Sequence, residues 1–107
     1  MKVAVPATGG SMNAQVSEAF GRCAYFIIVD TNTMKFEPVS NPGVGMMGGA
    51  GPAAARAIAE RGAEVVLTGA VGPNAKQTLN SLGIKVYTGY NNMTVKEAVE
   101  KFLQENK

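Results

Sequence analysis

The amino-acid sequence predicts a single α/β domain spanning residues 1–107, with a mixed five-stranded sheet and helices on both of its faces. Two observations predict this fold class. The second half of the chain alternates short apolar runs with amphipathic segments, which is typical of right-handed parallel crossovers. The first half carries two strand-like runs joined by a polar turn, which indicates an antiparallel hairpin. The chain has 107 residues, 46% of them hydrophobic, which is enough to form one buried core.

The first half of the sequence contains three expected strands. The uninterrupted apolar run before Asp30 is typical of a strand buried on both faces. Pro38 cannot donate a backbone hydrogen bond, so it places the third strand at the edge of the sheet. Val16 and Phe20 have helical i, i+4 spacing, which predicts a short helical turn. The expected strands, loop and turn are Lys2–Pro6, Tyr25–Asp30, Met34–Ser40, Ala7–Asn13 and Asn13–Phe20.

The second half contains three expected helices separated by two short strands. Proline favours the first turn of a helix and glycine follows the last, so helices are expected at Pro52–Arg61 and Pro73–Leu82. The residues Thr94-Val95-Lys96-Glu97 have capping-box spacing and open a final amphipathic helix. The strands between these helices are expected at Glu64–Thr68 and Ile84–Thr88. The predicted order is therefore β, β, β, α, β, α, β, α.

Five glycines lie within the nine residues from Gly43 to Gly51. A glycine-rich loop that leads into a helix exposes backbone N–H groups, which predicts a binding site. Gly43–Gly48 matches the dinucleotide pattern G-x-G-x-x-G, but Asn41-Pro42 separates it from the strand, so this interpretation is disfavoured. Ligands of such sheets lie beyond the carboxyl ends of the strands. The expected loops there are Ala7–Asn13, Asn41–Gly51, Gly69–Gly72 and Gly89–Met93.

Composition disfavours several function classes. The chain has no histidine, one aspartate and one cysteine, so neither a Cys-His pair nor a cluster of carboxylates for two metal ions is expected. The net charge is only +2 and the basic residues are scattered, which disfavours nucleic-acid binding. No apolar run is long enough to span a membrane. No signal peptide is expected, and the lone cysteine favours a cytoplasmic location.

Four side chains and one small loop have two or more interpretations. Cys23 follows Arg22, so it is either an activated thiol ligand or a small buried hydrophobe. Met46 and Met47 could ligate a soft metal such as Cu(I), cover a ligand as an apolar lid, or pack into the core. Arg22 either pairs with an anion or is solvated at the surface. Gly69–Pro73 either binds an anion through backbone N–H groups or simply forms a tight connection.

Several segments together resemble the dinitrogenase iron–molybdenum cofactor-binding family. The resemblance rests on Met1–Pro6, Val16–Phe26, the glycine loop leading into Gly51–Ala55, and Leu67–Ala75, so it covers essentially the whole chain. It implies a ribonuclease H-like fold and places the chain among small stand-alone relatives of nitrogenase accessory factors. Members of the family commonly carry histidine at the positions of Ala19 and of Met46-Met47. This chain therefore lacks the histidines that the family would use for ligation.

The resemblance and the residues together predict a binding or carrier protein without enzymatic activity. Its ligand would be the iron–molybdenum cofactor or an iron–sulfur precursor, exchanged with a donor or acceptor protein. The alternatives are a small-molecule or nucleotide/phosphate-binding module and a protein-interaction module. The oligomeric state is left open. Cys23 is the candidate metal ligand, and the expected cofactor-binding residues are Arg22, Cys23, Met46, Met47, Gly48, Gly49, Gly51, Gly69 and Gly72.

Overall fold

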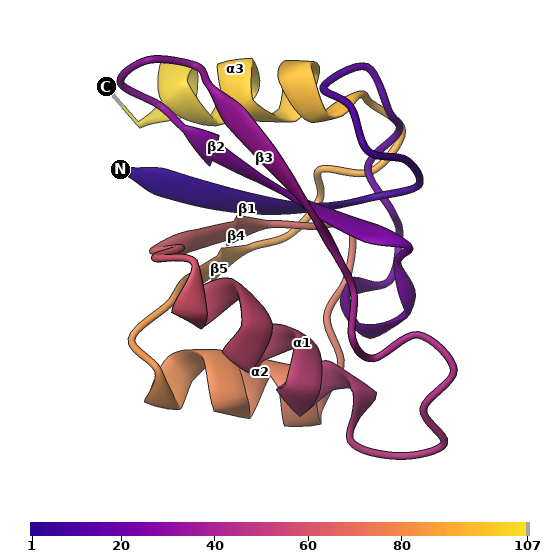
Figure 1. The fold of residues 1–107 in the computed structure, drawn as a ribbon. Helices are drawn as coiled ribbons and strands as arrows, with labels where there is room; N and C mark the ends of the chain where they lie inside the picture. Colours follow the sequence, from indigo (N-terminus) through magenta and orange to yellow (C-terminus); the bar gives the residue numbers. More distant parts are fainter. Residues whose placement is uncertain (107) are drawn as a thin grey trace.

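The computed structural model describes residues 1–106 and contains one five-stranded sheet (Figure 1). The strands are arranged in the order β3-β2-β1-β4-β5. Their bounds are β1 Lys2–Ala7, β2 Tyr25–Asp30, β3 Phe36–Ser40, β4 Val65–Leu67 and β5 Lys85–Tyr87. β2 runs antiparallel to both β1 and β3, whereas β4 is parallel to β1 and to β5. The mixed five-stranded sheet that the sequence predicts is thus confirmed.

These strand directions bring most of the loops to one edge of the sheet. The carboxyl ends of β1, β3, β4 and β5 meet there, together with the amino end of the antiparallel β2. We call this the carboxyl edge, and it comprises residues 8–24, 41–49, 68–72 and 88–94. The opposite amino edge comprises the starts of β1, β3, β4 and β5, the end of β2 and the turns that connect them. Ligands of open α/β sheets bind at the carboxyl edge.

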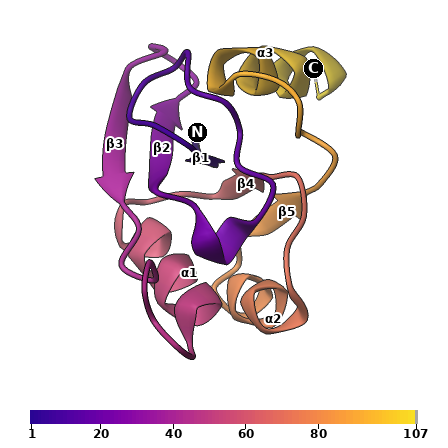
Figure 2. The same ribbon diagram turned by 90° about the vertical axis from the view of Figure 1, so that its right-hand side faces the viewer.

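Helices cover both faces of the sheet, as the sequence predicts (Figures 1 and 2). α1 (Ala50–Glu60) and α2 (Pro73–Ser81) lie on one face, and α3 (Val95–Glu105) lies on the other. Strand residues alternate between the two cores. Phe26 packs in the cluster that contains Ile58 of α1, and its neighbour Ile27 packs in the cluster that contains Phe102 of α3. No helix in residues 1–106 is long and apolar enough to cross a membrane.

The helical turn expected over Asn13–Phe20 is wrong. Val16 instead forms a β-bridge with Ala7, and Ala19 forms one with Ala70. The two residues with i, i+4 spacing serve different cores: Val16 packs in the cluster under α3, and Phe20 packs in the cluster under α1 and α2. The chain therefore crosses from one face of the sheet to the other within this segment. Only Phe20–Arg22 is helical, as a single 3₁₀ turn.

Two element boundaries also differ from expectation. α1 begins at Ala50, two residues before Pro52, because Gly49 has the left-handed backbone (φ 73°) that turns the loop into the helix. β3 begins at Phe36 because Met34 has a positive φ of 61° and belongs to the turn. The predicted capping box of α3 is confirmed. The Thr94 hydroxyl accepts from the Glu97 N–H at 3.2 Å, and the Thr94 N–H donates to the Glu97 carboxylate at 2.9 Å.

Candidate functional site

A cavity of about 580 Å³ opens at the carboxyl edge of the sheet, between the starts of α1 and α2. Three segments that are distant in the sequence form its walls: residues 19–22, 48–52 and 70–75. Figure 2 shows the 3₁₀ turn lying between the first turns of the two helices. The sheet topology therefore creates the cavity, because each wall is a connection at the same edge.

The first wall is the 3₁₀ turn Phe20–Arg22, which the core fixes in place. The Phe20 ring is 1% exposed, and its centroid lies 5.0 Å from that of Phe26. The buried amide of Asn41 donates to the carbonyl oxygens of Gly21 at 3.1 Å and Cys23 at 2.9 Å. Its oxygen accepts from the Gly43 N–H at 2.8 Å. Asn41 thus ties the first wall to the start of the glycine loop.

The second and third walls are the amino-terminal turns of α1 and α2, which lie side by side. A Cβ atom at Gly51 would lie 2.8 Å from the Cβ of Ala75, so only glycine permits this approach. At Gly48 and Gly72, which also line the cavity, neither the packing nor the backbone conformation requires glycine. Neither has a positive φ, and a Cβ at either position would meet nothing within 4 Å. The absence of side chains at these two residues keeps the cavity open without serving the packing of the protein.

Both helix starts have unpaired backbone N–H groups at residues that line the cavity. Neither helix has a side-chain cap at its N-terminus, which leaves the first donors free. Pro52 and Pro73 lack an N–H group altogether. Among the backbone hydrogen bonds that residues 1–106 form outside the helices and strands, none is donated by the N–H of Gly48, Gly49, Ala50, Gly51, Val71, Gly72, Asn74 or Ala75. Those of the eight that lie in a helix are in its first turn, where the N–H groups have no partner within the helix.

The electrostatics of the cavity favour an anion. The positive ends of two helix dipoles meet there. Arg22 is the one charged residue among those that line it, so the lining itself contains no carboxylate. The Arg22 guanidinium donates from Nη1 to the Met46 carbonyl oxygen at 3.3 Å, and no carboxylate of residues 1–106 forms an ion pair with it. Its remaining N–H groups are available to an anionic ligand.

The structure brings together some of the predicted site residues and separates others. Those that line the cavity are Arg22, Gly48, Gly49, Gly51 and Gly72. Cys23, Met46, Met47 and Gly69 lie outside its lining. A Cβ at Gly69 would lie 3.2 Å from the Glu18 backbone, so this glycine serves a close approach of two chain segments. Asn74 is a lining residue that the sequence did not single out; its position just inside a helix start was the available signal.

Cys23 lies in the core and not at the surface of the cavity. Its side chain is 2% exposed and packs in the cluster that contains Phe20 and Phe26. Burial raises the pKa of the thiol from its ordinary 9.0 to about 12, which keeps it protonated at neutral pH. The Sγ atom donates to the Phe20 carbonyl oxygen at 3.4 Å. The structure thus supports the small buried hydrophobe among the two interpretations of Cys23.

Met46 and Met47 project from the glycine loop. Met47 is 101% exposed and Met46 is 37% exposed, so neither packs into the core. A metal ion bound by their thioethers would need further ligands. Residues 1–106 contain no group of three or more His, Cys, Asp or Glu residues that could hold a metal ion. Of the interpretations given above, core packing is excluded for Met47.

The fold and the cavity define a small α/β domain with a cavity at the carboxyl edge of its sheet whose lining has one cationic and no acidic residue. The chain belongs to the dinitrogenase iron–molybdenum cofactor family, whose profile matches residues 1–105. An uncharacterized protein of Methanocaldococcus jannaschii is 32% identical, and the match covers 97% of this chain and 86% of that protein.

Two solved structures share this fold. The apo form of the orange protein from Desulfovibrio gigas has a TM-score of 0.94 and is 43% identical, over 97% of this chain and 88% of that chain. A putative NifB protein from Thermotoga has a TM-score of 0.83 and is 36% identical, over 96% of this chain and 87% of that chain. The predicted family membership is confirmed.

Proposed function

We propose that this protein binds an anionic metal-cluster cofactor in the cavity at the carboxyl edge, carries it, and performs no chemistry of its own. One observation carries the proposal: eight residues with unpaired backbone N–H groups line the cavity together with Arg22, and its lining contains no acidic residue. The family membership supports the iron–molybdenum cofactor or an iron–sulfur precursor as the ligand. Exchange of this ligand with a donor or acceptor protein is part of the same proposal.

The residues present fit a cluster held by hydrogen bonds and charge. Cys23, the candidate metal ligand, is buried with a raised pKa and does not line the cavity. Direct ligation would therefore require the 3₁₀ turn to open. Backbone N–H groups can instead donate to the sulfide or oxide atoms on the surface of an anionic cluster, and Arg22 can offset part of its charge. Non-covalent retention also suits a carrier, since release breaks no metal–ligand bond.

Three finer expectations remain predictions. The resemblance implies a ribonuclease H-like fold, which the strand order β3-β2-β1-β4-β5 accommodates. The lone cysteine favours a cytoplasmic location. The absence of enzymatic activity is expected because residues 1–106 contain no histidine and no cluster of metal-binding side chains. Genomic neighbours that encode nitrogenase assembly would support the proposed role.

The test is anaerobic incubation with extracted iron–molybdenum cofactor, or with iron and sulfide, followed by desalting, absorption spectra and metal analysis. We expect wild-type protein and Cys23→Ala to retain similar amounts of cluster. The double variant Gly48→Ala/Gly72→Ala places two methyl groups in the cavity and should lower retention at least about tenfold. Its matched control is Gly10→Ala, where a Cβ makes ordinary contacts at 3.6 Å outside the cavity. No retained cluster in the wild type would refute the proposal.

A second candidate is a nucleotide or phosphorylated metabolite. The same N–H groups and Arg22 are suited to a phosphate, which commonly binds at helix N-termini. A thermal-shift screen against nucleotides and sugar phosphates separates the two candidates. Stabilisation by a phosphate ligand that Gly48→Ala/Gly72→Ala abolishes would favour this alternative. A flat response together with cluster retention would exclude it.

A further inference from the structure

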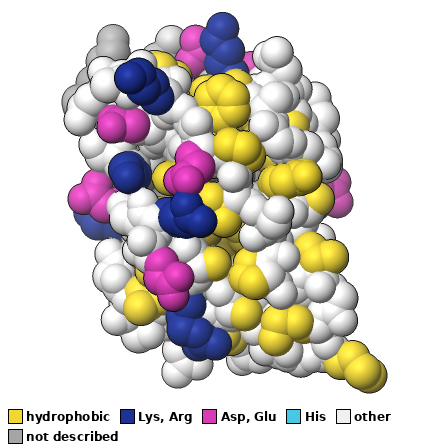
Figure 3. All heavy atoms as spheres, viewed as in Figure 1, with side chains coloured by type: hydrophobic (Ala, Val, Ile, Leu, Met, Phe, Trp, Pro, Cys, Tyr) yellow, Lys and Arg dark blue, Asp and Glu magenta, His cyan; other side chains and the backbone are white. Residues whose placement is uncertain are grey.

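The carboxyl edge is nearly free of charged side chains. The sequence has ten Lys and Arg and eight Asp and Glu residues, yet only Glu18 and Arg22 fall within residues 8–24, 41–49, 68–72 and 88–94. Figure 3 shows this distribution on one face: charged side chains gather on the left, and the lower right, over the 41–49 loop, shows hydrophobic and uncharged groups. Loops at a protein surface usually carry many charged side chains. The small number of charges at this edge therefore indicates a role other than exposure to water.

The same edge exposes large apolar side chains. Met47 is 101% exposed, Val44 57%, Met46 37% and Tyr25 36%. The first three lie on the loop whose Gly48 and Gly49 line the cavity. Nothing in the packing of residues 1–106 uses the Met47 side chain, so its exposure has no structural explanation within the chain. An exposed apolar surface beside a ligand site is typical of a protein-interaction surface.

We infer that the carboxyl edge is a docking surface for a different protein that covers the mouth of the cavity. The inference rests on the proposed function, since the partner would deliver or accept the ligand. Depletion of charge and enrichment in methionine are features of the centres of protein interfaces. Methionine side chains are flexible, which lets Met46 and Met47 adapt to an apolar surface. The partner's contact face is therefore apolar, and it carries no cluster of basic residues.

Electrostatics select this occupant over a second copy of the chain. Two copies docked through this edge would bring together four positive helix ends and two Arg22 side chains, with only Glu18 of each copy to oppose them. Like potentials at an interface are unfavourable. An anionic membrane surface is also disfavoured. Its attraction depends on clusters of basic residues, and Arg22 is the single basic residue of this edge. A partner with a neutral or weakly acidic face is not repelled by the positive helix ends, and its binding does not depend on a cluster of basic residues.

The test uses two matched pairs of lysine substitutions. Met46→Lys/Met47→Lys adds two charges to the proposed surface. Met34→Lys/Phe36→Lys adds two charges at the amino edge, where both residues are exposed, at 38% and 44%. Each tagged protein captures partners from a lysate of the source organism, and proteins retained by the wild type are identified, purified and titrated. We expect the control pair to bind like the wild type and the Met46/Met47 pair at least about tenfold more weakly.

The dependence on salt gives an independent readout. An interface almost without charge should change its affinity by less than about threefold between low and high ionic strength. A steep salt dependence would overturn the inference. Equal capture by all variants, or no specific capture by the wild type, would do the same. Self-association of the wild type in light scattering that Met46→Lys/Met47→Lys abolishes would also overturn it, as would sedimentation of the wild type with anionic vesicles.

The proposed docking surface and the proposed ligand site can be tested independently of each other. Met46→Lys/Met47→Lys leaves the lining of the cavity unchanged and should retain the cluster while losing the partner. Gly48→Ala/Gly72→Ala should lose the cluster and keep the partner. Cluster retention without any specific partner would refute the inference and preserve the proposed function. A specific partner without cluster retention in any variant would refute the proposed function, and with it the assignment of that partner as a ligand donor or acceptor.

Discussion

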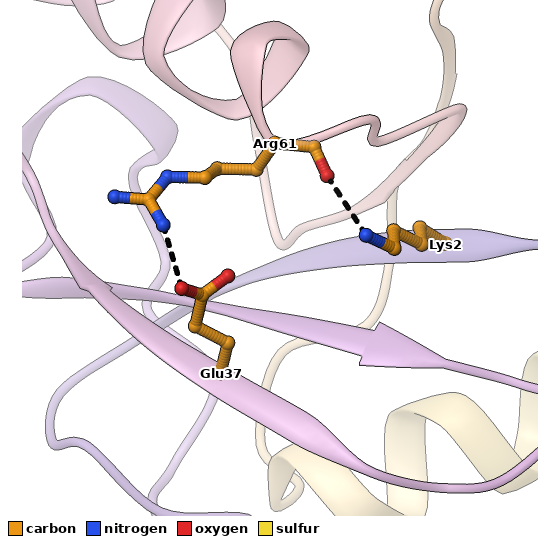
Figure 4. A network of polar contacts seen from close by, with 3 residues as sticks. All are labelled: Lys2, Glu37 and Arg61. Atoms are coloured by element: carbon orange, nitrogen blue, oxygen red, sulfur yellow. Dashed lines mark hydrogen bonds and ion pairs between the residues drawn. The ribbon is translucent and has the colours of Figure 1, made fainter.

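The two edges of the sheet differ in the chemistry of their side chains. The amino edge is charged: the Arg61 guanidinium lies 2.6 Å from the Glu37 carboxylate, and Lys2 donates to the Arg61 carbonyl oxygen at 3.4 Å (Figure 4). The carboxyl edge has unpaired backbone N–H groups, exposed methionines and only Glu18 and Arg22 as charged residues. The charged edge interacts with water, whereas the nearly uncharged edge is the one that we propose binds a ligand and a partner.

The largest expected effect concerns the packing of the carboxyl edge. Gly51→Val places a side chain where the Cβ of Ala75 lies 2.8 Å from an added Cβ, so we expect a loss of about 2–3 kcal/mol in the free energy of unfolding. Gly48→Val is the control, because nothing lies within 4 Å of a Cβ there, and it should cost less than about 0.5 kcal/mol. Urea unfolding measures both. Equal losses would show that the two glycines do not differ in role.

The next effect compares arginines at the two edges. Arg22→Gln removes the charge at the cavity and should weaken cluster retention about tenfold while leaving the unfolding midpoint unchanged. Arg61→Gln removes a charge from the amino edge and should leave retention unchanged. Metal analysis of desalted samples measures the difference. Equal retention by the two variants would refute a specific role for Arg22.

A pH-dependent effect tests the interior behind the carboxyl edge. The Cys23 thiol ionises near pH 9.0 when unfolded and near pH 12 when folded, because burial raises its pKa. The unfolded state therefore loses its proton first, and this contribution to stability is complete below pH 9 and lost progressively above it. Between pH 8 and pH 10 the wild type should lose about 1.4 kcal/mol more than Cys23→Ala. Parallel losses in the two proteins would show that the thiol ionises in the folded state.

The smallest effect concerns the Arg61–Glu37 ion pair at the amino edge. The two side chains are 48% and 53% exposed, so water and salt screen their attraction. A double-mutant cycle with Arg61→Gln and Glu37→Gln should give a coupling energy of about 0.5 kcal/mol that falls at high salt. A coupling above about 1.5 kcal/mol would give the amino edge a larger part in stability than its exposure indicates.

Sequence patterns predicted the architecture well because they report burial and periodicity. The apolar run before Asp30, the proline at the start of α2 and the Thr94 capping box all correspond to observed features. The prediction failed over Asn13–Phe20, where Val16 and Phe20 have helical spacing but enter different cores. Spacing alone does not reveal that a chain segment crosses the sheet.

The candidate site was predicted in part, because the sequence identifies residue types but not their surroundings. Arg22 and four of the predicted glycines line the cavity. The glycine loop suggested one role for all its glycines, whereas Gly49 serves a left-handed turn, Gly51 serves helix packing, and Gly48 serves neither. Cys23 was the strongest metal-binding side chain by type, but its burial depends on Phe20 and Phe26, which the tertiary fold brings to it.

The distance in sequence between the three walls of the cavity restricts when a ligand can be loaded. Residues 19–22 are synthesised first, whereas residues 70–75, which complete the cavity, are synthesised last of the three walls. The starts of α1 and α2 meet only after that point, at Gly51 and Ala75. Nascent chains that end before α2 therefore have no complete site. Under the proposed function, a cofactor can therefore be loaded only after α2 has been made and has packed against α1.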